Sequence, residues 1–327
     1  ACTPSRCWRS AADQPATASD SPDDTAAAKP VRFDLELRRD TIRVQSVKGW
    51  ERTGPGESDY SWFVTPGVGY VRLGQFSENT DREFREAIAA MKKSGPLTGV
   101  IVDLRFNPGG YLNQAVNIAN RLVSAERGFI VATIAPGQRD PSDQSFVVPN
   151  STLVKNIPVI ILVNESSASA SEIVAGAVQY FEKSGGVKAL ILGQRSYGKG
   201  SVQTVTALNP RAQLKLTTHY YALPAANDKG FRVIHRKPGD LTWGIEPDLA
   251  VDMMPKAMTD GLLLRRDADV FFTPDPKNNP SEQINPTRIL DEGFDVQLEA
   301  AMLLLKSQQF LGHQPADRRA ATVEPVR

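Results

Sequence analysis

The sequence predicts an α/β protein whose core is built from stacked β–α units. Three short apolar runs without alternation are typical of strands covered on both faces: Gly99–Leu104, Pro158–Val163 and Ala189–Gly193. A Gly- or Ser-rich turn follows each run, and apolar residues at helical spacing follow the first two turns. This repeated order of strand, turn and helix is the pattern of a parallel sheet with helices packed against it.

The segments before these runs have the patterns of a polar leader, two strand pairs and a helix. Residues 1–30 hold hardly any large apolar side chain, so we expect a disordered leader. Residues 31–47 alternate between apolar and charged side chains, which predicts two half-buried strands joined by a turn. Residues 67–76 begin another strand pair. From Asn79 the apolar residues recur at helical spacing until Gly95-Pro96 ends the helix.

The later elements follow from the same rules. A helix through Leu122 follows the first buried strand, and a helix around Ile173–Phe181 follows the second. Strands and loops are expected from Leu214 to Val251. Residues 270–290 are rich in Pro and Asn and indicate an exposed connection, whereas Asp295–Lys306 has the pattern of an amphipathic helix. The chain thus divides into a leader (1–30), a strand pair (31–47), an α/β core (48–255) and a C-terminal extension with one amphipathic helix (256–327).

The composition excludes several classes of function. The 327 residues include 38 Lys and Arg against 37 Asp and Glu, a net charge of +1 without a basic stripe, which argues against nucleic acid as the main partner. No apolar run approaches the ~20 residues of a membrane span. Cys2 and Cys7 are too few for a disulfide scaffold or a Cys-rich zinc site, and the three His form no HExxH motif. No metal or organic cofactor is expected.

Two turns carry residue types suited to nucleophilic chemistry. Asn164–Glu172 (NESSASASE) leaves a buried strand and enters a helix, where unpaired N–H groups and a partial positive charge favour a serine nucleophile. Taken alone, such serines are more often helix caps. Ser196–Gln203 (SYGKGSVQ) flanks Lys199 with two glycines just past another buried strand. Partial burial disfavours a charged amine, and an uncharged lysine can act as general base for a hydroxyl.

A third turn, Arg105–Gly110 (RFNPGG), also joins a buried strand to a helix. It can direct main-chain N–H groups at an oxyanion, although any β–α loop can use Pro-Gly-Gly simply as a turn. Because the carboxyl ends of parallel strands meet at one edge of the sheet, the three turns are expected to open on a shared cleft. Asp103 and Arg105 themselves are expected to form a structural pair.

Five segments together resemble the C-terminal processing (tail-specific) serine peptidases, in family order and over about residues 31–307. These segments are GVGYVRLGQFSENT, VIVDLRFNPGGYLNQAVNIAN, PVIILVNESSASASEIVAGAVQ, LILGQRSYGKGSVQ and WGIEPDLAVD. The resemblance implies a ClpP/crotonase-like core and a serine endopeptidase that cleaves protein or peptide substrates near their C-termini through an acyl-enzyme. It also implies an extracytoplasmic location, the bacterial periplasm, and leaves the oligomeric state unknown.

The resemblance assigns roles to individual residues. Ser169 matches the family nucleophile, Lys199 its general base, and Gln203 the residue that positions the base. The oxyanion donors would be the main-chain N–H groups of Gly109, Gly110 and Ala170.

Two departures from the family pattern accompany these assignments. Family members usually carry a peptide-binding PDZ domain before the core, and here only residues 31–47 resemble its last strands. The spacing between Ser169 and Lys199 is also somewhat long, with a surface insertion expected at Phe181–Val187.

Alternative functions were weighed against this interpretation. Ser196 and Lys199 form an SxxK pair, but the flanking glycines disfavour the helix that such a motif requires, and no SDN or KTG motif follows. No GxSxG motif indicates an α/β-hydrolase. A catalytically silent peptide-binding or scaffold protein on the same fold is the remaining alternative, since fold does not imply function.

Overall fold

The structure is a computed structural model, and it contains two compact units, Ala1–Val44 and Gln45–Arg327. It describes residues 6–9, 31–34, 44–56, 58–138, 141, 143–225, 230–271 and 284–312. In the first unit, β1 (Arg6–Arg9) pairs antiparallel with β2 (Val31–Asp34). Residues 6–9 therefore form a strand within the segment for which we expected disorder, and the rest of residues 1–30 lies outside the described residues.

The second unit is built on a seven-stranded sheet with the order β16-β12-β11-β8-β7-β3, with β6 also pairing with β7. The strands from β16 to β7 are parallel, whereas β3 and β6 run antiparallel to β7. Their bounds are β3 (Val47–Lys48), β6 (Phe63–Thr65), β7 (Val68–Leu73), β8 (Gly99–Asp103), β11 (Val159–Val163), β12 (Ala189–Gly193) and β16 (Leu249–Ala250). The predicted α/β class with stacked β–α units is confirmed.

The boundary of the α/β core lies earlier in the chain than the division at residue 48 suggests. Val47 is completely buried, and β3 pairs with β7 in the central sheet. The end of the range 31–47 therefore belongs to the core, because a strand at the sheet edge buries Val47 there. Whether residues 31–34 are a remnant of a PDZ-like domain stays a prediction, and residues 35–43 lie outside the described residues.

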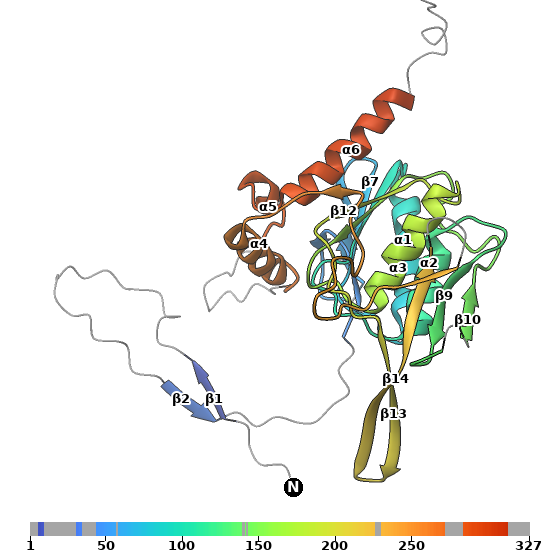
Figure 1. Cartoon of the computed structure of the whole chain (residues 1–327). Helices are drawn as coiled ribbons and strands as arrows, with labels where there is room; N and C mark the ends of the chain where they lie inside the picture. The colour runs from blue at the N-terminus through green and yellow to red at the C-terminus, as the bar shows by residue number, and fades with distance from the viewer. Residues whose placement is uncertain are drawn as a thin grey trace, which may run out of the picture. The chain divides into compact units, whose positions relative to one another are not determined.

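Both faces of the sheet are covered, as the unbroken apolar runs predict. Along β8, Val100 and Val102 join one hydrophobic cluster, whereas Ile101 between them joins the other, since successive side chains point to opposite faces. The helices α1 (Thr80–Ser94), α2 (Leu112–Leu122) and α3 (Ala170–Lys183) cover the first face. Leu298, Ala301 and Leu305 of α6 (Val296–Gly312) pack against the second (Figure 1).

A second sheet of antiparallel strands adjoins the helices of the first face. Its order is β10-β9-β14-β13, with β15 also pairing with β14. The strands are β9 (Phe129–Ile134), β10 (Asp143–Phe146), β13 (Ser201–Asn209), β14 (Ala212–Pro224) and β15 (Phe231–Val233). The long hairpin of β13 and β14 extends beyond the rest of this unit (Figure 1). A further short pair joins β4 (Glu51–Arg52) and β5 (Tyr60–Ser61).

The C-terminal extension carries three helices in its described part where the sequence predicts one. The predicted helix at Asp295–Lys306 is confirmed as α6, but α4 (Pro255–Ala268) and α5 (Arg288–Asp291) precede it. The sequence pattern missed α4 because its buried positions are Arg265 and Ala268 rather than an apolar stripe. None of the helices in the described ranges is long and apolar enough to span a membrane.

Candidate active site

The three predicted turns follow β8, β11 and β12, and they meet at the carboxyl edge of the parallel sheet. Ser169 is the N-cap residue of α3, and its backbone φ is 57°, a region that non-glycine residues rarely adopt. Gly109 lies directly against it: a Cβ atom on Gly109 would stand 2.6 Å from the Cβ of Ser169 and 2.9 Å from the nitrogen of Ala170. The RFNPGG turn and the serine turn are thus in backbone contact.

Asn107 joins these two turns. Its carbonyl oxygen accepts hydrogen bonds from the Ala168 N–H at 3.0 Å and from the Ser171 hydroxyl at 3.0 Å. Its side-chain Oδ1 accepts from the Gly109 N–H at 2.9 Å. Of the three predicted oxyanion donors, the Gly109 N–H is therefore already occupied.

The other two predicted donors, the N–H groups of Gly110 and Ala170, make no hydrogen bond to any group in the described part of the chain. The Ala170 N–H is unpaired because the first N–H groups of a helix have no partner within it. Gly110 sits where its backbone φ is 146°, and a Cβ there would meet the Phe76 carbonyl oxygen, so only glycine fits. Two adjacent backbone donors are therefore available beside Ser169.

Lys199 is half-buried and lines the same cavity as Ser169. We call it the Ser169 cavity; its volume is about 320 Å³, and its lining includes Gly110, Ser169, Ala170, Lys199, Gln203, Lys215 and Tyr221. The glycines on either side of Lys199 allow tight packing of the loop. A Cβ on Gly198 would stand 2.7 Å from the Trp243 ring, and a Cβ on Gly200 would stand 2.8 Å from the backbone nitrogen of His235. The structure thus brings Ser169, Lys199 and Gln203 to one cavity.

Glu172 connects the serine turn to the lysine loop. Its carboxylate is fully buried, and Oε2 accepts from the Ser169 N–H at 2.8 Å and from the Lys199 N–H at 2.9 Å. Oε1 accepts from the Ser196 hydroxyl at 2.5 Å and the Gly198 N–H at 2.6 Å. Burial raises the pKa of Glu172, and these hydrogen bonds oppose that rise. One carboxylate oxygen thereby holds the backbones of both predicted catalytic residues.

The contacts of Ser196 exclude it as the nucleophile of an SxxK pair. Its side chain is buried; besides donating to Glu172, its hydroxyl accepts from the Ile245 N–H at 2.7 Å. The segment around it is not helical. Ser196 is therefore a structural residue of the loop.

Tyr221 is a residue of the site that the sequence does not reveal. It comes from β14 and is 2% exposed. Its hydroxyl donates to the Lys199 carbonyl, and the hydroxyl oxygen also lies 3.4 Å from Glu172 Oε2. Its hydroxyl is also within hydrogen-bonding reach of the Ser169 side chain. Burial, together with the nearby Glu172 charge, raises the pKa of Tyr221 well above its ordinary value, so the hydroxyl keeps its proton. Lys215, from the same strand, also lines the cavity without a signal in the sequence.

Gln203 lies on β13 beside a register shift between Val202 and Gln203, where the pairing with β14 skips one residue. Such a bulge turns a side chain relative to regular pairing. Gln203 is exposed and lines the Ser169 cavity two residues after Ser201 and four after Lys199. Gln203 and Lys199 therefore line the same cavity, and no hydrogen bond between the side chains of these two described residues is present.

Comparison with known proteins decides the family. The sequence pattern of "Peptidase family S41" matches residues 67–251, more than half of the chain and all three turns of the site. The chain belongs to peptidase family S41. The S41 match covers the segments from β7 to β16 and therefore the entire parallel part of the central sheet.

Individual S41 relatives are similar over the same region. The "Carboxy-terminal-processing protease" of Bartonella bacilliformis is 35% identical over 224 residues, which are 67% of this chain and 44% of that protein. A "Probable CtpA-like serine protease" of Staphylococcus epidermidis is 33% identical over 220 residues, covering 67% of this chain and 38% of that protein. The chain therefore spans less than half the length of these relatives.

A solved structure supports the same assignment. The "Photosystem II D1 C-terminal processing protease" is 26% identical, with a TM-score of 0.50, over 76% of this chain and 58% of that one. This chain therefore resembles that protease in the arrangement of its strands and helices as well as in sequence.

Proposed function

We propose that the chain is a serine endopeptidase in which Ser169 is the nucleophile and Lys199 the general base. The observation that carries the proposal is that both residues line one cavity and that their backbones donate to the same oxygen of Glu172. Membership of family S41 supports it independently. A catalytically silent protein is not favoured, because the nucleophile, base and donors are all retained in one cavity.

The reaction proceeds in two steps with balanced proton transfer. The Ser169 hydroxyl oxygen attacks the carbonyl carbon of a peptide bond while uncharged Lys199 accepts the hydroxyl proton. Collapse of the tetrahedral adduct breaks the C–N bond, and Lys199 returns the proton to the leaving amine. Water then attacks the carbonyl carbon of the acyl-enzyme and gives a proton to Lys199. Collapse of this second adduct breaks the bond between that carbon and the Ser169 oxygen, and Lys199 returns the proton to Ser169 as the product leaves as a carboxylic acid.

The Gly110 and Ala170 N–H groups are proposed to stabilise the oxyanion, because they are the two of the three expected donors without a partner in the described part of the chain. Each such donor is worth about 3–4 kcal/mol in the transition state. The Gly109 N–H already donates to Asn107 Oδ1, so Gly109 would not donate to the oxyanion. Its lack of a side chain would instead allow the turn to approach Ser169 closely. Gln203 is proposed to position the Lys199 amine.

The substrates proposed are proteins, cleaved near their C-termini, in keeping with the names of the S41 relatives. An extracytoplasmic location is proposed on the same basis, and the bacterial periplasm is its most specific form. Two residues of the β13–β14 hairpin, Gln203 and Lys215, line the cavity, so a substrate bound there would contact this hairpin.

The test incubates the full chain with an unfolded protein that ends in apolar residues and identifies products by mass spectrometry. Ser169→Ala and Lys199→Met should each remove cleavage. Matched controls are Ser166→Ala on the same loop and Lys188→Met, both exposed and outside the cavity, which should cleave like the wild type. Cleavage that persists in Ser169→Ala would refute the assignment, and binding without cleavage by the wild type would favour the scaffold alternative.

A further inference from the structure

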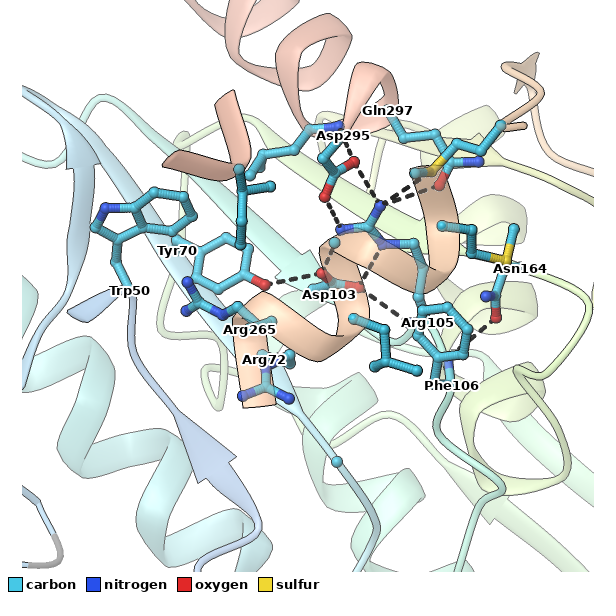
Figure 2. A pocket seen from close by; sticks show the side chains of 17 residues that line it. Trp50, Tyr70, Arg72, Asp103, Arg105, Phe106, Asn164, Arg265, Asp295 and Gln297 are labelled. Carbon is cyan, nitrogen blue, oxygen red and sulfur yellow. Dashed lines mark hydrogen bonds and ion pairs between the residues drawn. The ribbon is translucent and has the colours of Figure 1, made fainter. Parts of the chain in front are cut away.

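A second cavity lies on the other face of the sheet, under α4 and α6. We call it the Arg265 pocket; its volume is about 260 Å³, and it shares no lining residue with the Ser169 cavity. Its polar lining includes Arg72, Asp103, Arg105, Asn164 and Arg265 (Figure 2). Neither the S41 match nor the proposed catalytic mechanism assigns it a role.

The two carboxylates that line this pocket, Asp103 and Asp295, are already ion-paired. Asp103 accepts from Arg105 Nε at 2.9 Å and Nη2 at 2.7 Å, and from the Tyr70 hydroxyl at 2.8 Å. Asp295 accepts from both terminal nitrogens of Arg105 at 2.7 Å. The expected structural pair of Asp103 and Arg105 is thus confirmed, and it is completed by an acid from the start of α6 (Figure 2). Both acids are ion-paired with Arg105, so neither is an uncompensated negative charge in the pocket.

The third acid nearby is also engaged. Asp269 pairs with Lys48 at 2.9 Å and with Arg72. Four cations, Lys48, Arg72, Arg105 and Arg265, therefore face three carboxylates, and Arg265 is the cation left without an ion pair among the described residues.

Arg265 is buried despite lacking a carboxylate partner. It is 5% exposed, and its Nη2 donates to the Gly49 carbonyl at 2.6 Å. Its guanidinium carbon lies 4.7 Å from the Trp50 ring centroid and 5.0 Å from that of Tyr70. The aromatic faces stabilise the charge, but they leave the N–H groups at the edge unsatisfied. Nε and Nη1 are both buried without a hydrogen-bond partner in the described part of the chain.

Two further donors at the same pocket are unpaired. The Oδ1 of Asn164 accepts from the Phe106 and Ser166 N–H groups at 3.0 and 3.1 Å, which fixes the amide orientation and leaves Nδ2 as a buried donor without a partner. Arg72 Nε is likewise unpartnered. Of the seven such buried side-chain atoms in the described residues, four line this pocket, and all four are N–H donors. A ligand that fits must therefore supply acceptors and negative charge.

The rest of the lining is apolar and limits the size of the ligand. Met258 and Leu262 of α4, Ile289 of α5 and Leu298 of α6 face the cavity together with Trp50. A cavity of about 260 Å³ is slightly smaller than ordinary ligand pockets and suits a group the size of one amino acid. These properties favour a ligand with a short aliphatic chain and an anionic end group.

We propose that the Arg265 pocket binds the carboxylate of a small aliphatic acid, with the acid on Arg265 and the hydrocarbon against α4 and α6. A carboxylate can accept a charge-assisted hydrogen bond from Nε or from Nη1 of Arg265. The N–H groups of these two nitrogens point to opposite edges of the guanidinium, so one carboxylate accepts from one of them. The same chemistry is offered by a free aliphatic acid and by the C-terminal residue of a polypeptide. The inference does not depend on the proposed peptidase activity, because its test measures binding.

The experiment titrates the full chain with 4-methylpentanoate, with N-acetyl-leucine as the mimic of a chain end, and with the uncharged 4-methylpentanamide, by calorimetry and thermal denaturation. At least one acid should bind and raise the denaturation midpoint. The amide should bind about tenfold more weakly or worse, because it cannot replace the charge-assisted hydrogen bonds. Binding of only the free acid or only N-acetyl-leucine identifies the source.

Two variants complete the test. Arg265→Met keeps an apolar side chain of similar length and should abolish acid binding, whereas Arg266→Met, an exposed neighbour on α4, should bind like the wild type. The proposal is overturned if neither acid binds the wild type, if acid and amide bind equally, or if Arg265→Met retains the affinity. Should Arg265→Met not fold, the comparison of acid with amide on the wild type decides by itself.

Discussion

Replacing Gly109 by alanine should damage both stability and activity, because the glycine is where the oxyanion turn meets the nucleophile turn. The new Cβ would stand 2.6 Å from the Cβ of Ser169, 2.9 Å from the Ala168 carbonyl oxygen and 2.9 Å from the Ala170 nitrogen. Two of these three neighbours are backbone atoms, which cannot rotate away. The backbone φ of 101° adds strain for any residue with a side chain.

The expected loss of stability combines these two contributions. An unfavourable φ costs about 1–3 kcal/mol, and forcing extra atoms into a packed site costs about 1–3 kcal/mol more. Gly137→Ala separates the two, since Gly137 has a φ of 83° but no atom within 4 Å of an added Cβ. Gly137→Ala should therefore show the conformational cost alone.

The assay is urea denaturation of both variants, followed by peptide cleavage under conditions where both are folded. Displacing the serine turn by a fraction of an ångström to an ångström is expected to lower the cleavage rate of Gly109→Ala roughly a hundredfold. Gly137→Ala should cleave at the wild-type rate. Equal stability of the two variants, together with full activity of Gly109→Ala, would refute the close approach of the two turns.

Two further predictions concern the buried acids. Glu172→Gln should slow cleavage far more than Glu182→Gln, an exposed control on the same helix, because one amide oxygen cannot accept from all the donors around Glu172. Burial raises the pKa of Glu172 in the folded protein above its ordinary value of 4.5. The wild type should therefore lose stability as the pH rises from 4.5 through the pKa of the folded state, and Glu172→Gln should lack this pH dependence. Asp103 acts in the opposite sense: burial alone would raise its pKa, but Arg105 outweighs burial and lowers it below the ordinary 3.8, so stability present at higher pH is lost as the pH falls below about 4. Glu172→Gln lacks the opposing slope, so urea midpoints of this variant that do not decline as the pH falls below about 4 would contradict the prediction for Asp103.

The sequence predicts the parts of the site that come from local motifs. Ser169, Lys199 and the glycine turn each follow a buried apolar strand, and parallel strands necessarily bring their carboxyl ends to one edge. The buried strands can be recognised because successive residues, such as Val100 and Ile101, pack into hydrophobic clusters on opposite faces of the sheet. No position of such a strand faces solvent, so its sequence is an unbroken apolar run.

The sequence does not predict contacts that depend on distant segments. The sequence pattern indicates only an ordinary first-turn acid at Glu172. Apart from the nearby Ser169 N–H, however, its donors come from residues 24 to 49 positions away. Tyr221 is one of several aromatic residues on β14, and nothing local distinguishes it. Arg265 lies in a helix without an apolar stripe. Its guanidinium packs on Trp50 and Tyr70, which lie far from it in the sequence, so no local pattern indicates that it is buried.

The most direct test of the central claim is to trap the covalent intermediate. The protein is mixed with an activated peptide ester, quenched in acid after a fraction of a turnover, and its mass is measured before and after proteolytic mapping. The account predicts one added acyl group, located on Ser169, and much slower acylation when Lys199 is replaced by methionine. An acyl group on any other residue, or an unchanged acylation rate without Lys199, would contradict it.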